Sequence, residues 1–299
     1  MSLGERLFRA LTEASSYIIL FLVIAIGYSL LLDSLPVFTK FGIWFLFSSE
    51  WDPVRQIFGA LPAVIGTLET SVLALVMATP VAVGAALFVH EISPAPIMRL
   101  FSPIIDALAS IPSVIYGLWG LFFLMPLLKE WVMRPLNEAL GFIPLFSGSP
   151  QGPSILLASV ILAIMILPTI ASLTLEALKM VPRELVEGAL ALGATRWEAV
   201  RITILPHASE SIKASMMLAL ARALGETMAV TMVIGNTYKL PVSLLEPGVT
   251  ITSIIANSYT EATSELHISA LLALGFILLL ISVVVNVISR RLLGRVGHE

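Results

Sequence analysis

Six long runs of apolar residues limit how this chain can fold more than any other feature of its sequence. A membrane-spanning helix needs about 20 mostly apolar residues to cross roughly 30 Å of hydrocarbon. Only 12% of the 299 residues are charged, whereas soluble domains carry about 25%. We therefore expect an all-α integral membrane protein with six transmembrane helices, which we place at Ala14–Leu32, Thr70–Val89, Ala107–Leu128, Ser154–Leu175, Ala214–Ile234 and Ile268–Ser289.

The positions of the Lys and Arg residues predict which side of the membrane each loop occupies. With a cytoplasmic N-terminus, most of the 17 Lys and Arg residues lie on the cytoplasmic side, as the positive-inside rule requires. Both termini and the polar stretch Glu187–Pro206 are then cytoplasmic. Arg6 and Arg9 precede the first apolar run as in a signal peptide, but no small-x-small cleavage pattern follows it, so we interpret it as a retained helix.

The polar stretch between the fourth and fifth apolar runs is predicted to form a helical hairpin. Pro182 favours a helix that starts directly after it, and Gly193 is typical of the residue that ends a helix in the left-handed conformation. Thr195 followed by Glu198 matches a capping box. We therefore expect a second short helix over Thr195–Ile204.

The bend of this hairpin carries only small side chains, at Gly193 and Ala194, and we expect Pro206 to stop its second helix. Two interpretations follow from the local pattern alone. The small elbow inserts into a groove of another protein, or the amphipathic hairpin rests on the bilayer surface.

Two charged residues, Arg222 and Glu226, interrupt the fifth apolar run. Their spacing of four places them on one face of a helix, where they can pair. A charge at the bilayer centre costs about 2.5–3.5 kcal/mol on insertion scales, so such residues face the bundle interior or a water-filled cavity. Either Arg222 helps an anion pass while Glu226 holds or neutralises it between passages, or the two form a structural ion pair. Thr227 and Thr231 either line the same route or bond across helices.

Several kinds of site lack the residues needed to build them. The chain has no cysteine and four scattered histidines, so we expect no metal site. No G-x-x-x-x-G-K-[ST] loop occurs, and neither does G-x-S-x-G or H-E-x-x-H. A net charge of −3 gives no basic surface for nucleic acid. The chain is therefore expected not to be an enzyme, and any ATPase that drives it must be a separate chain.

The hairpin resembles the "EAA" loop of type I ABC-importer permeases. Glu187, Ala189, Gly193, Leu205 and Pro206 fall at the spacing of that loop. Two departures are Gly188, where the middle alanine is usual, and Thr203, where isoleucine is usual. In that family the loop is the cytoplasmic docking element for an ATPase subunit. The resemblance thus assigns ATPase coupling to Glu184, Glu187, Gly188, Ala189, Gly193, Ala194, Leu205 and Pro206.

The same resemblance implies a division of the chain into two parts. Residues 1–66 would form an N-terminal transmembrane helix and an outer segment. Residues 67–299 would form a MetI-like permease core of five helices, with the coupling loop at 180–210.

Three further segments resemble the C-type permease subunit of phosphate-specific (Pst) importers. They are RALGETMAVTMVIGN at Arg222–Asn236, IPSVIYGLWG at Ile111–Gly120 and ITSIIANSYTEA at Ile251–Ala262. The resemblance runs from about the second span to the C-terminus. It implies that the substrate is inorganic phosphate and that Arg222 and Glu226 are important for its passage, with Thr227 and Thr231 as further candidates for the substrate pathway.

The resemblance to that family also implies partners and a location. We expect a heterodimer with a PstA-like sister permease, two PstB-like ATPase subunits and an outer PstS-like phosphate-binding protein, all at a bacterial cytoplasmic (inner) membrane. ATP and Mg would bind to the ATPase subunits, so this chain itself needs no cofactor.

Three other functions stay open at this point. The same architecture could move another oxyanion, such as sulfate or molybdate. An ion-coupled carrier or channel is disfavoured because the sequence shows a single intramembrane charge pair and no inverted repeat. An integral-membrane enzyme is disfavoured because no catalytic constellation is visible.

Overall fold

The computed structural model describes residues 3–240 and 242–294, and within these ranges it is helical with no β-sheet. Its helices are α1 (Leu3–Phe41), α2 (Trp44–Phe47), α3 (Leu61–Leu87), α4 (Ala95–Ser110), α5 (Ser113–Trp119), α6 (Met125–Leu128), α7 (Arg134–Leu140), α8 (Ile155–Lys179), α9 (Arg183–Ala191), α10 (Arg196–Ala199), α11 (Leu205–Leu224), α12 (Met228–Val233), α13 (Ile251–Ser258) and α14 (Glu265–Gly294). The expected all-α fold is confirmed.

Short π-helical and 3₁₀ turns continue or join several of these helices. The π-helical turns are η1 (Phe88–Ile92), η2 (Gly120–Leu124), η3 (Lys129–Met133) and η5 (Val200–Ile204), and the 3₁₀ turns are η4 (Pro144–Phe146) and η6 (Tyr259–Glu261). Five helices of the described ranges are long and apolar enough to cross a membrane, namely Leu11–Phe41, Leu61–Ile92, Ser113–Leu140, Ile155–Lys179 and Glu265–Ser289.

Helix α8 forms the centre of the bundle. It packs most extensively on α3 and α11 and also contacts α4 and α12. The side chains of Ile155, Ile161, Ile166 and Ile170 are fully buried along it. Its start is fixed by Ser154, whose Oγ accepts a hydrogen bond from the backbone N–H of Leu157 over 3.1 Å, as an N-cap residue does.

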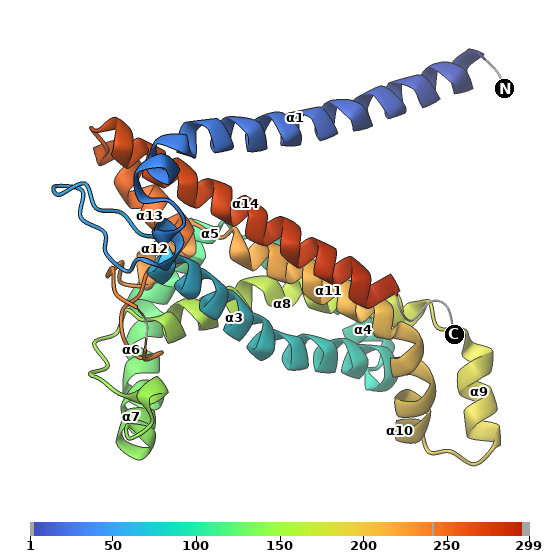
Figure 1. The fold of residues 1–299 in the computed structure, drawn as a ribbon. Helices are drawn as coiled ribbons and strands as arrows, with labels where there is room; N and C mark the ends of the chain where they lie inside the picture. Colours follow the sequence, from blue (N-terminus) through green and yellow to red (C-terminus); the bar gives the residue numbers. More distant parts are fainter. Residues whose placement is uncertain (1–2, 241, 295–299) are drawn as a thin grey trace.

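The two ends of the bundle differ in structure. The start of α1, the hairpin α9–α10 and the end of α14 lie at one end, and α2, α7 and α13 lie at the other (Figure 1). The hairpin and the described ends of α1 and α14 thus lie together, and the side of the membrane that they face stays a prediction. At the opposite end Trp51 and Tyr238 pack at 5.4 Å between ring centroids, and the Tyr238 hydroxyl donates to the carbonyl oxygen of Gly59.

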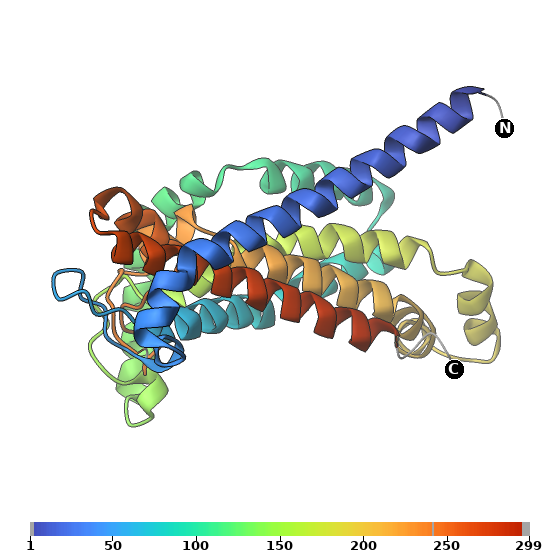
Figure 2. The same cartoon turned by 45° about the horizontal axis from the view of Figure 1, so that its top comes forward.

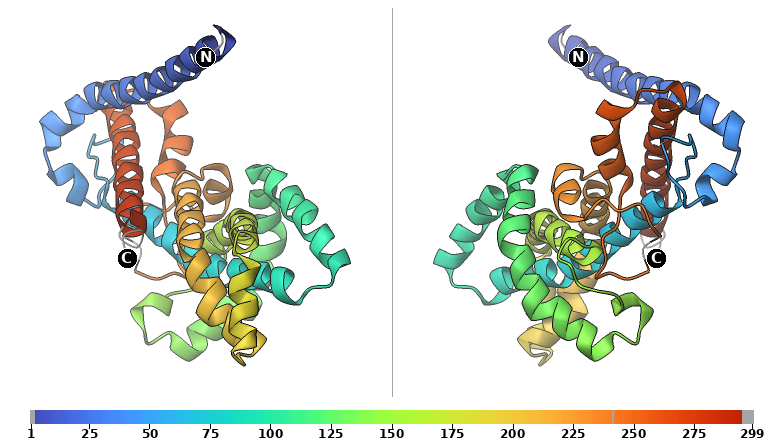
Figure 3. Two further views of the ribbon diagram at one scale, coloured as in Figure 1. Left: turned by 90° about the vertical axis from the view of Figure 1, so that its right-hand side faces the viewer. Right: turned by 90° about the vertical axis from the view of Figure 1, so that its left-hand side faces the viewer.

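Helix α1 is the least buried of the long helices. It packs mainly on α14, where Gly27 faces Leu279 and Gly275 faces Leu30. Its first half extends away from the bundle (Figures 2 and 3). Most of its apolar side chains are therefore exposed in the single chain.

The predicted third span, Ala107–Leu128, was wrong as one continuous helix. The chain breaks between α4 and α5, where Ile111 is extended with ψ of 127°. Pro112 causes the break, because a residue that precedes proline is disfavoured in the α conformation. The helical segment that starts at Ser113 then continues through α6 to the end of α7, beyond the predicted end.

The predicted fifth span, Ala214–Ile234, was also wrong as one helix. Helix α11 ends at Leu224 and α12 begins at Met228, so residues 225–227 form a break. Its second half, α12, has only 6 residues. The second span starts earlier than predicted, at Leu61, which places Glu69 inside α3. Its Oε2 atom is buried and accepts no hydrogen bond from the described residues.

Candidate functional site

The hairpin α9–α10 forms as its sequence predicts. Gly193 follows α9 with φ of +90°, the left-handed conformation that favours glycine. Thr195 caps α10: its Oγ1 accepts from the N–H of Glu198 over 3.3 Å, and Oε2 of Glu198 accepts from the N–H of Thr195 over 2.7 Å. The backbone N–H and the hydroxyl of Thr195, which both donate to Oε2 of Glu198, lower the pKa of this carboxyl below its usual value, with the backbone donor making the largest contribution.

The hairpin exposes apolar side chains beside its elbow. Leu192, next to the elbow, is 91% exposed, and Leu185 and Leu190 are also exposed. The opposite face of the hairpin is anchored, because Val200 and Ile204 are buried against the ends of α3 and α8. An exposed apolar surface beside a small elbow is typical of a protein contact site.

The predicted coupling residues are distributed over this hairpin. Ala189, Ala194 and Leu205 are half-buried, and the others are exposed, namely Glu184, Glu187, Gly188, Gly193 and Pro206. No heavy atom lies within 4 Å of the position that a Cβ of Gly188 or Gly193 would occupy. Both glycines therefore leave open space on the side of a partner.

The prediction that Pro206 stops the second hairpin helix was wrong. Helix α10, the π-helical turn η5 and α11 follow one another without a gap from Arg196 to Leu224. Within η5 the N–H of Leu205 bonds to the carbonyl oxygen of Val200. The π-helical turn already interrupts the regular i→i−4 hydrogen bonds directly before Pro206, so the proline is accommodated inside the continuous helix. The hairpin thus leads directly into the helix that carries Arg222.

Arg222 and Glu226, whose spacing would let them pair in a regular helix, form no ion pair in this structure. Arg222 lies in the last turn of α11, whereas Glu226 lies in the break, so the two no longer share a helical face. Nη1 of Arg222 instead donates to Oγ1 of Thr169 on α8 over 3.4 Å. Oε1 of Glu226 accepts from the N–H of Ala229 at the start of α12 over 3.3 Å.

Helix α13 holds the break in place. The hydroxyl of Thr252 donates to the carbonyl oxygen of Glu226 over 2.9 Å. Thr250 and Ser253 form a capping box at the start of the same helix. Sequence reasoning missed this contact because the two segments are 26 positions apart and the capping box has serine in place of the usual glutamate or glutamine.

Thr227 and Thr231 serve the local backbone in this chain. Oγ1 of Thr227 donates to the carbonyl oxygen of Gly225 over 3.2 Å, and Oγ1 of Thr231 donates to that of Thr227 over 2.7 Å. Such bonds stabilise a non-helical break within an apolar segment. The break therefore brings Arg222, Glu226 and Thr227 into one short region, with Thr231 one turn farther along.

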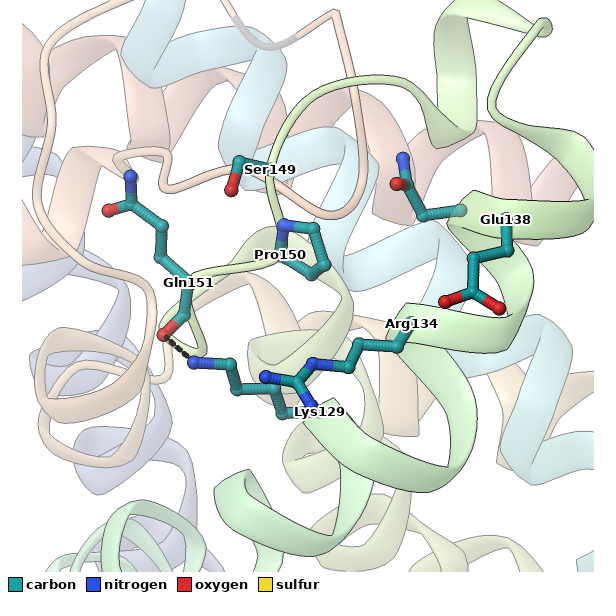
Figure 4. Close-up of a pocket in the computed structure, with 7 residues that line it drawn as sticks. Lys129, Arg134, Glu138, Ser149, Pro150 and Gln151 are labelled. Carbon is teal, nitrogen blue, oxygen red and sulfur yellow. Dashed lines mark hydrogen bonds between the residues drawn. The ribbon is translucent and has the colours of Figure 1, made fainter.

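A polar pocket at the opposite end of the bundle was not predicted by any motif. It has a volume of about 550 Å³ and is lined by Lys129, Arg134, Asn137, Glu138, Ser149, Pro150 and Gln151. Lys129 and Arg134 reach toward the same space, and Nζ of Lys129 donates to the carbonyl oxygen of Gln151 over 3.3 Å (Figure 4). Asn137 fixes the facing loop through bonds to the carbonyl oxygens of Phe146 and Gly148.

The fold and the hairpin define the membrane-spanning component of an ABC transporter. Residues 78–298 match the family described as the binding-protein-dependent transport system inner membrane component, and the chain belongs to that family. The chain also superimposes on the inward-facing MetNI methionine ABC transporter with a TM-score of 0.59 at 18% identity, over 79% of this chain and 95% of that chain. A bacterial ABC transporter involved in the import of alginate gives a TM-score of 0.57 at 18% identity, over 97% and 99%.

Within this family the chain falls among the phosphate transport system permease proteins PstC. The PstC protein of Pasteurella multocida is 44% identical over 99% of this chain and 93% of its own length. That of Mesorhizobium japonicum is 42% identical over 99% and 91%. A probable PstC of Methanocaldococcus jannaschii is 35% identical over 94% and 91%. The resemblance inferred from the three sequence segments is thus confirmed.

Proposed function

We propose that this chain is the permease subunit through which an ATP-driven importer moves inorganic phosphate into the cytoplasm. One observation carries the proposal: identity of 44% to a phosphate permease extends over nearly the whole chain, and so includes both the hairpin and the helix break. Moving an ion across a membrane requires no chemistry on the permease, in keeping with a chain that transports and does not catalyse.

The hairpin supports coupling to a separate ATPase. Gly193 and Ala194 form an elbow without bulky side chains, and the exposed Leu192 beside it offers an apolar contact. Because α10 continues into α11, displacement of the elbow moves the helix that carries Arg222. Two PstB-like subunits, which would bind ATP and Mg, would close on each other and pull the hairpins of the two permeases. This chain itself would hold no cofactor.

The break in the fifth span supports a pathway for an anion. The guanidinium of Arg222 is exposed in the single chain, although it lies in a bundle that is otherwise apolar. A charge at that depth needs a polar surrounding or a partner. A PstA-like sister permease would cover this side, so the pathway would run between the two subunits. Phosphate would contact Arg222, and Glu226, Thr227 and Thr231 would line its route.

The remaining partners follow from the two ends of the bundle. A PstS-like phosphate-binding protein would dock on the end formed by α2, α7 and the segment before α13, where the polar pocket of Lys129 and Arg134 opens. The hairpin would face the cytoplasm, where the ATPases are. The complex would lie in a bacterial inner membrane.

Uptake of labelled phosphate by vesicles that contain the whole complex tests the function. We expect ATP-dependent uptake that unlabelled phosphate suppresses and that sulfate and molybdate at the same concentration leave unchanged. Suppression by sulfate or molybdate would assign the permease to another oxyanion. Uptake without ATP, driven by an ion gradient, would contradict the importer.

A further inference from the structure

A largely apolar cavity lies between the end of α3 and the second arm of the hairpin. It has a volume of about 390 Å³. Gly84, Leu87 and Phe88 line it from α3 and the first residue of η1, Glu91 and Ile92 continue from η1, and Arg196, Trp197 and Val200 close it from the hairpin. The hollow lies beside the packed contact that Val200 and Ile204 make with the ends of α3 and α8.

The rim of this cavity is unusually apolar for a surface at the end of a bundle. Ile92 is 72% exposed and Trp197 is 66% exposed, and half of the Phe88 side chain is also exposed. Exposed apolar surface of this kind marks a site that another molecule covers. The end of α3 is the level at which a spanning helix leaves the hydrocarbon, and tryptophan is enriched at that level of the membrane.

The lining of the cavity carries one cationic and one anionic side chain, Arg196 and Glu91. Among the described residues Arg196 has no carboxylate within ion-pair distance. The carboxylate of Glu91, the other charged group of the lining, is held by Nδ1 of His90 at 2.6 Å. Arginine binds phosphate groups through several N–H donors at once. The cavity thus combines one free guanidinium with an apolar wall, which is the chemistry of a phospholipid and not of a small hydrophilic ion.

We propose that this cavity binds one anionic phospholipid of the inner leaflet. Its phosphate group contacts Arg196, and part of an acyl chain lies against Leu87, Phe88 and Trp197. The lipid fills the space between α3 and the hairpin, and so seats the hairpin on the membrane surface. The proposal rests on the placement of the hairpin at the inner leaflet but not on the identity of the transported anion.

Quenching of Trp197 fluorescence by brominated lipids tests this site directly. The complete transporter is reconstituted in vesicles of phosphatidylcholine that contain either brominated phosphatidylglycerol or brominated phosphatidylcholine at one mole fraction. The signal of Trp197 is the difference between the wild-type complex and its Trp197→Phe variant. We expect quenching at least twofold stronger with the phosphatidylglycerol, and no reversal when inorganic phosphate is added. Reversal by phosphate would assign the site to the free ion.

Substitutions of Arg196 separate a headgroup contact from general membrane proximity. Arg196→Ala should abolish the preference for phosphatidylglycerol, and Arg196→Lys should retain most of it. Arg201→Ala is the matched control, since Arg201 is exposed on the same arm but does not line the cavity; it should leave the preference unchanged. Size-exclusion profiles show that each variant complex is assembled.

Three results would overturn the proposal. Equal quenching by both lipids would show that the site does not recognise the headgroup. An undiminished preference in Arg196→Ala would show that Arg196 does not bind the headgroup. Quenching that is seen only when the ATPase subunits are left out would show that an ATPase covers the cavity. Phosphate uptake by the same vesicles is measured separately, so failure of the lipid site is distinguishable from failure of the transport function.

Discussion

The hydroxyl of Thr252 donates a hydrogen bond to the backbone carbonyl oxygen of Glu226 over 2.9 Å, and so ties the start of α13 to the break between α11 and α12. The carbonyl belongs to a non-helical segment inside an apolar bundle. Without this donor the oxygen would have to be satisfied by water or by a shift of the chain. The geometry of the proposed anion pathway therefore depends on a residue outside the helix that carries Arg222.

Replacement of Thr252 by valine should destabilise the protein. Valine keeps the shape of threonine but removes the donor, and an unsatisfied buried acceptor costs about 1–3 kcal/mol. The thermal unfolding midpoint of the purified complex should fall, and phosphate uptake should fall with it. Thr252→Ser, which keeps the hydroxyl, is the control. An unchanged midpoint in Thr252→Val would mean that the bond contributes nothing to the break.

Replacement of Arg222 by glutamine should abolish phosphate uptake, with a loss of at least tenfold, while the complex still assembles. The neutral side chain keeps hydrogen-bond donors but no longer attracts an anion. Arg222→Lys should retain part of the activity, because it keeps the charge. Lys213→Gln removes a cation from an exposed position of the same helix and should leave uptake unchanged. Normal uptake in Arg222→Gln would show that Arg222 has only a structural role.

Replacement of Gly193 by valine should weaken retention of the ATPase subunits. Gly193 has φ of +90°, and an L-residue in the left-handed region costs roughly 1–2 kcal/mol. The elbow would change conformation and gain a branched side chain. Co-purification with the tagged permease measures the effect.

The matched control for the elbow is Gly188→Ala, in the interior of α9. The added methyl group meets no atom within 4 Å, and the helix gains roughly 0.5–1 kcal/mol from the better helix former. Although Gly188 belongs to the predicted coupling residues, alanine is the usual residue at its position in the EAA loop, so ATPase retention should be unchanged. Equal loss in both variants would mean that the whole hairpin, and not its elbow, determines docking.

Replacement of Gly66 by alanine should destabilise the bundle strongly. A Cβ on Gly66 would lie 2.1 Å from the backbone carbonyl oxygen of Val249, which no side-chain rotation can relieve. Overpacking of this kind typically costs about 1–3 kcal/mol. Gly84→Ala, in the same helix, meets no atom within 4 Å and should not lower stability. The thermal unfolding midpoints of the two variants should differ clearly, and equal midpoints would contradict the close packing at Gly66.

Local signals in the sequence predicted the parts of the site that depend on neighbouring residues. The hairpin followed from Gly193 and from the capping box of Thr195, because each acts within four positions of itself. The break at Ile111 has an equally local cause in Pro112, but the apolar run around it favoured a single span. In these cases the sequence contained the signal.

Other features depend on contacts between distant segments and could not be predicted in this way. The helix break at Gly225–Thr227 is held by Thr252, and no local pattern marks it. Pro206 suggested a helix end, yet the π-helical turn before it let the helix continue. The interpretation of Arg222 and Glu226 as an ion pair assumed a regular helix, and the break places Glu226 outside that helix.

The uninterrupted helical path from Arg196 to Leu224 bears on the timing of transport. No loop separates the arm that would meet the ATPase from the residue that would meet the anion. In the proposed mechanism a displacement of the hairpin would therefore reach Arg222 through one helix, with the π-helical turn η5 as the irregular point along it. Closure of the ATPases and the movement of Arg222 would then belong to one step of the cycle.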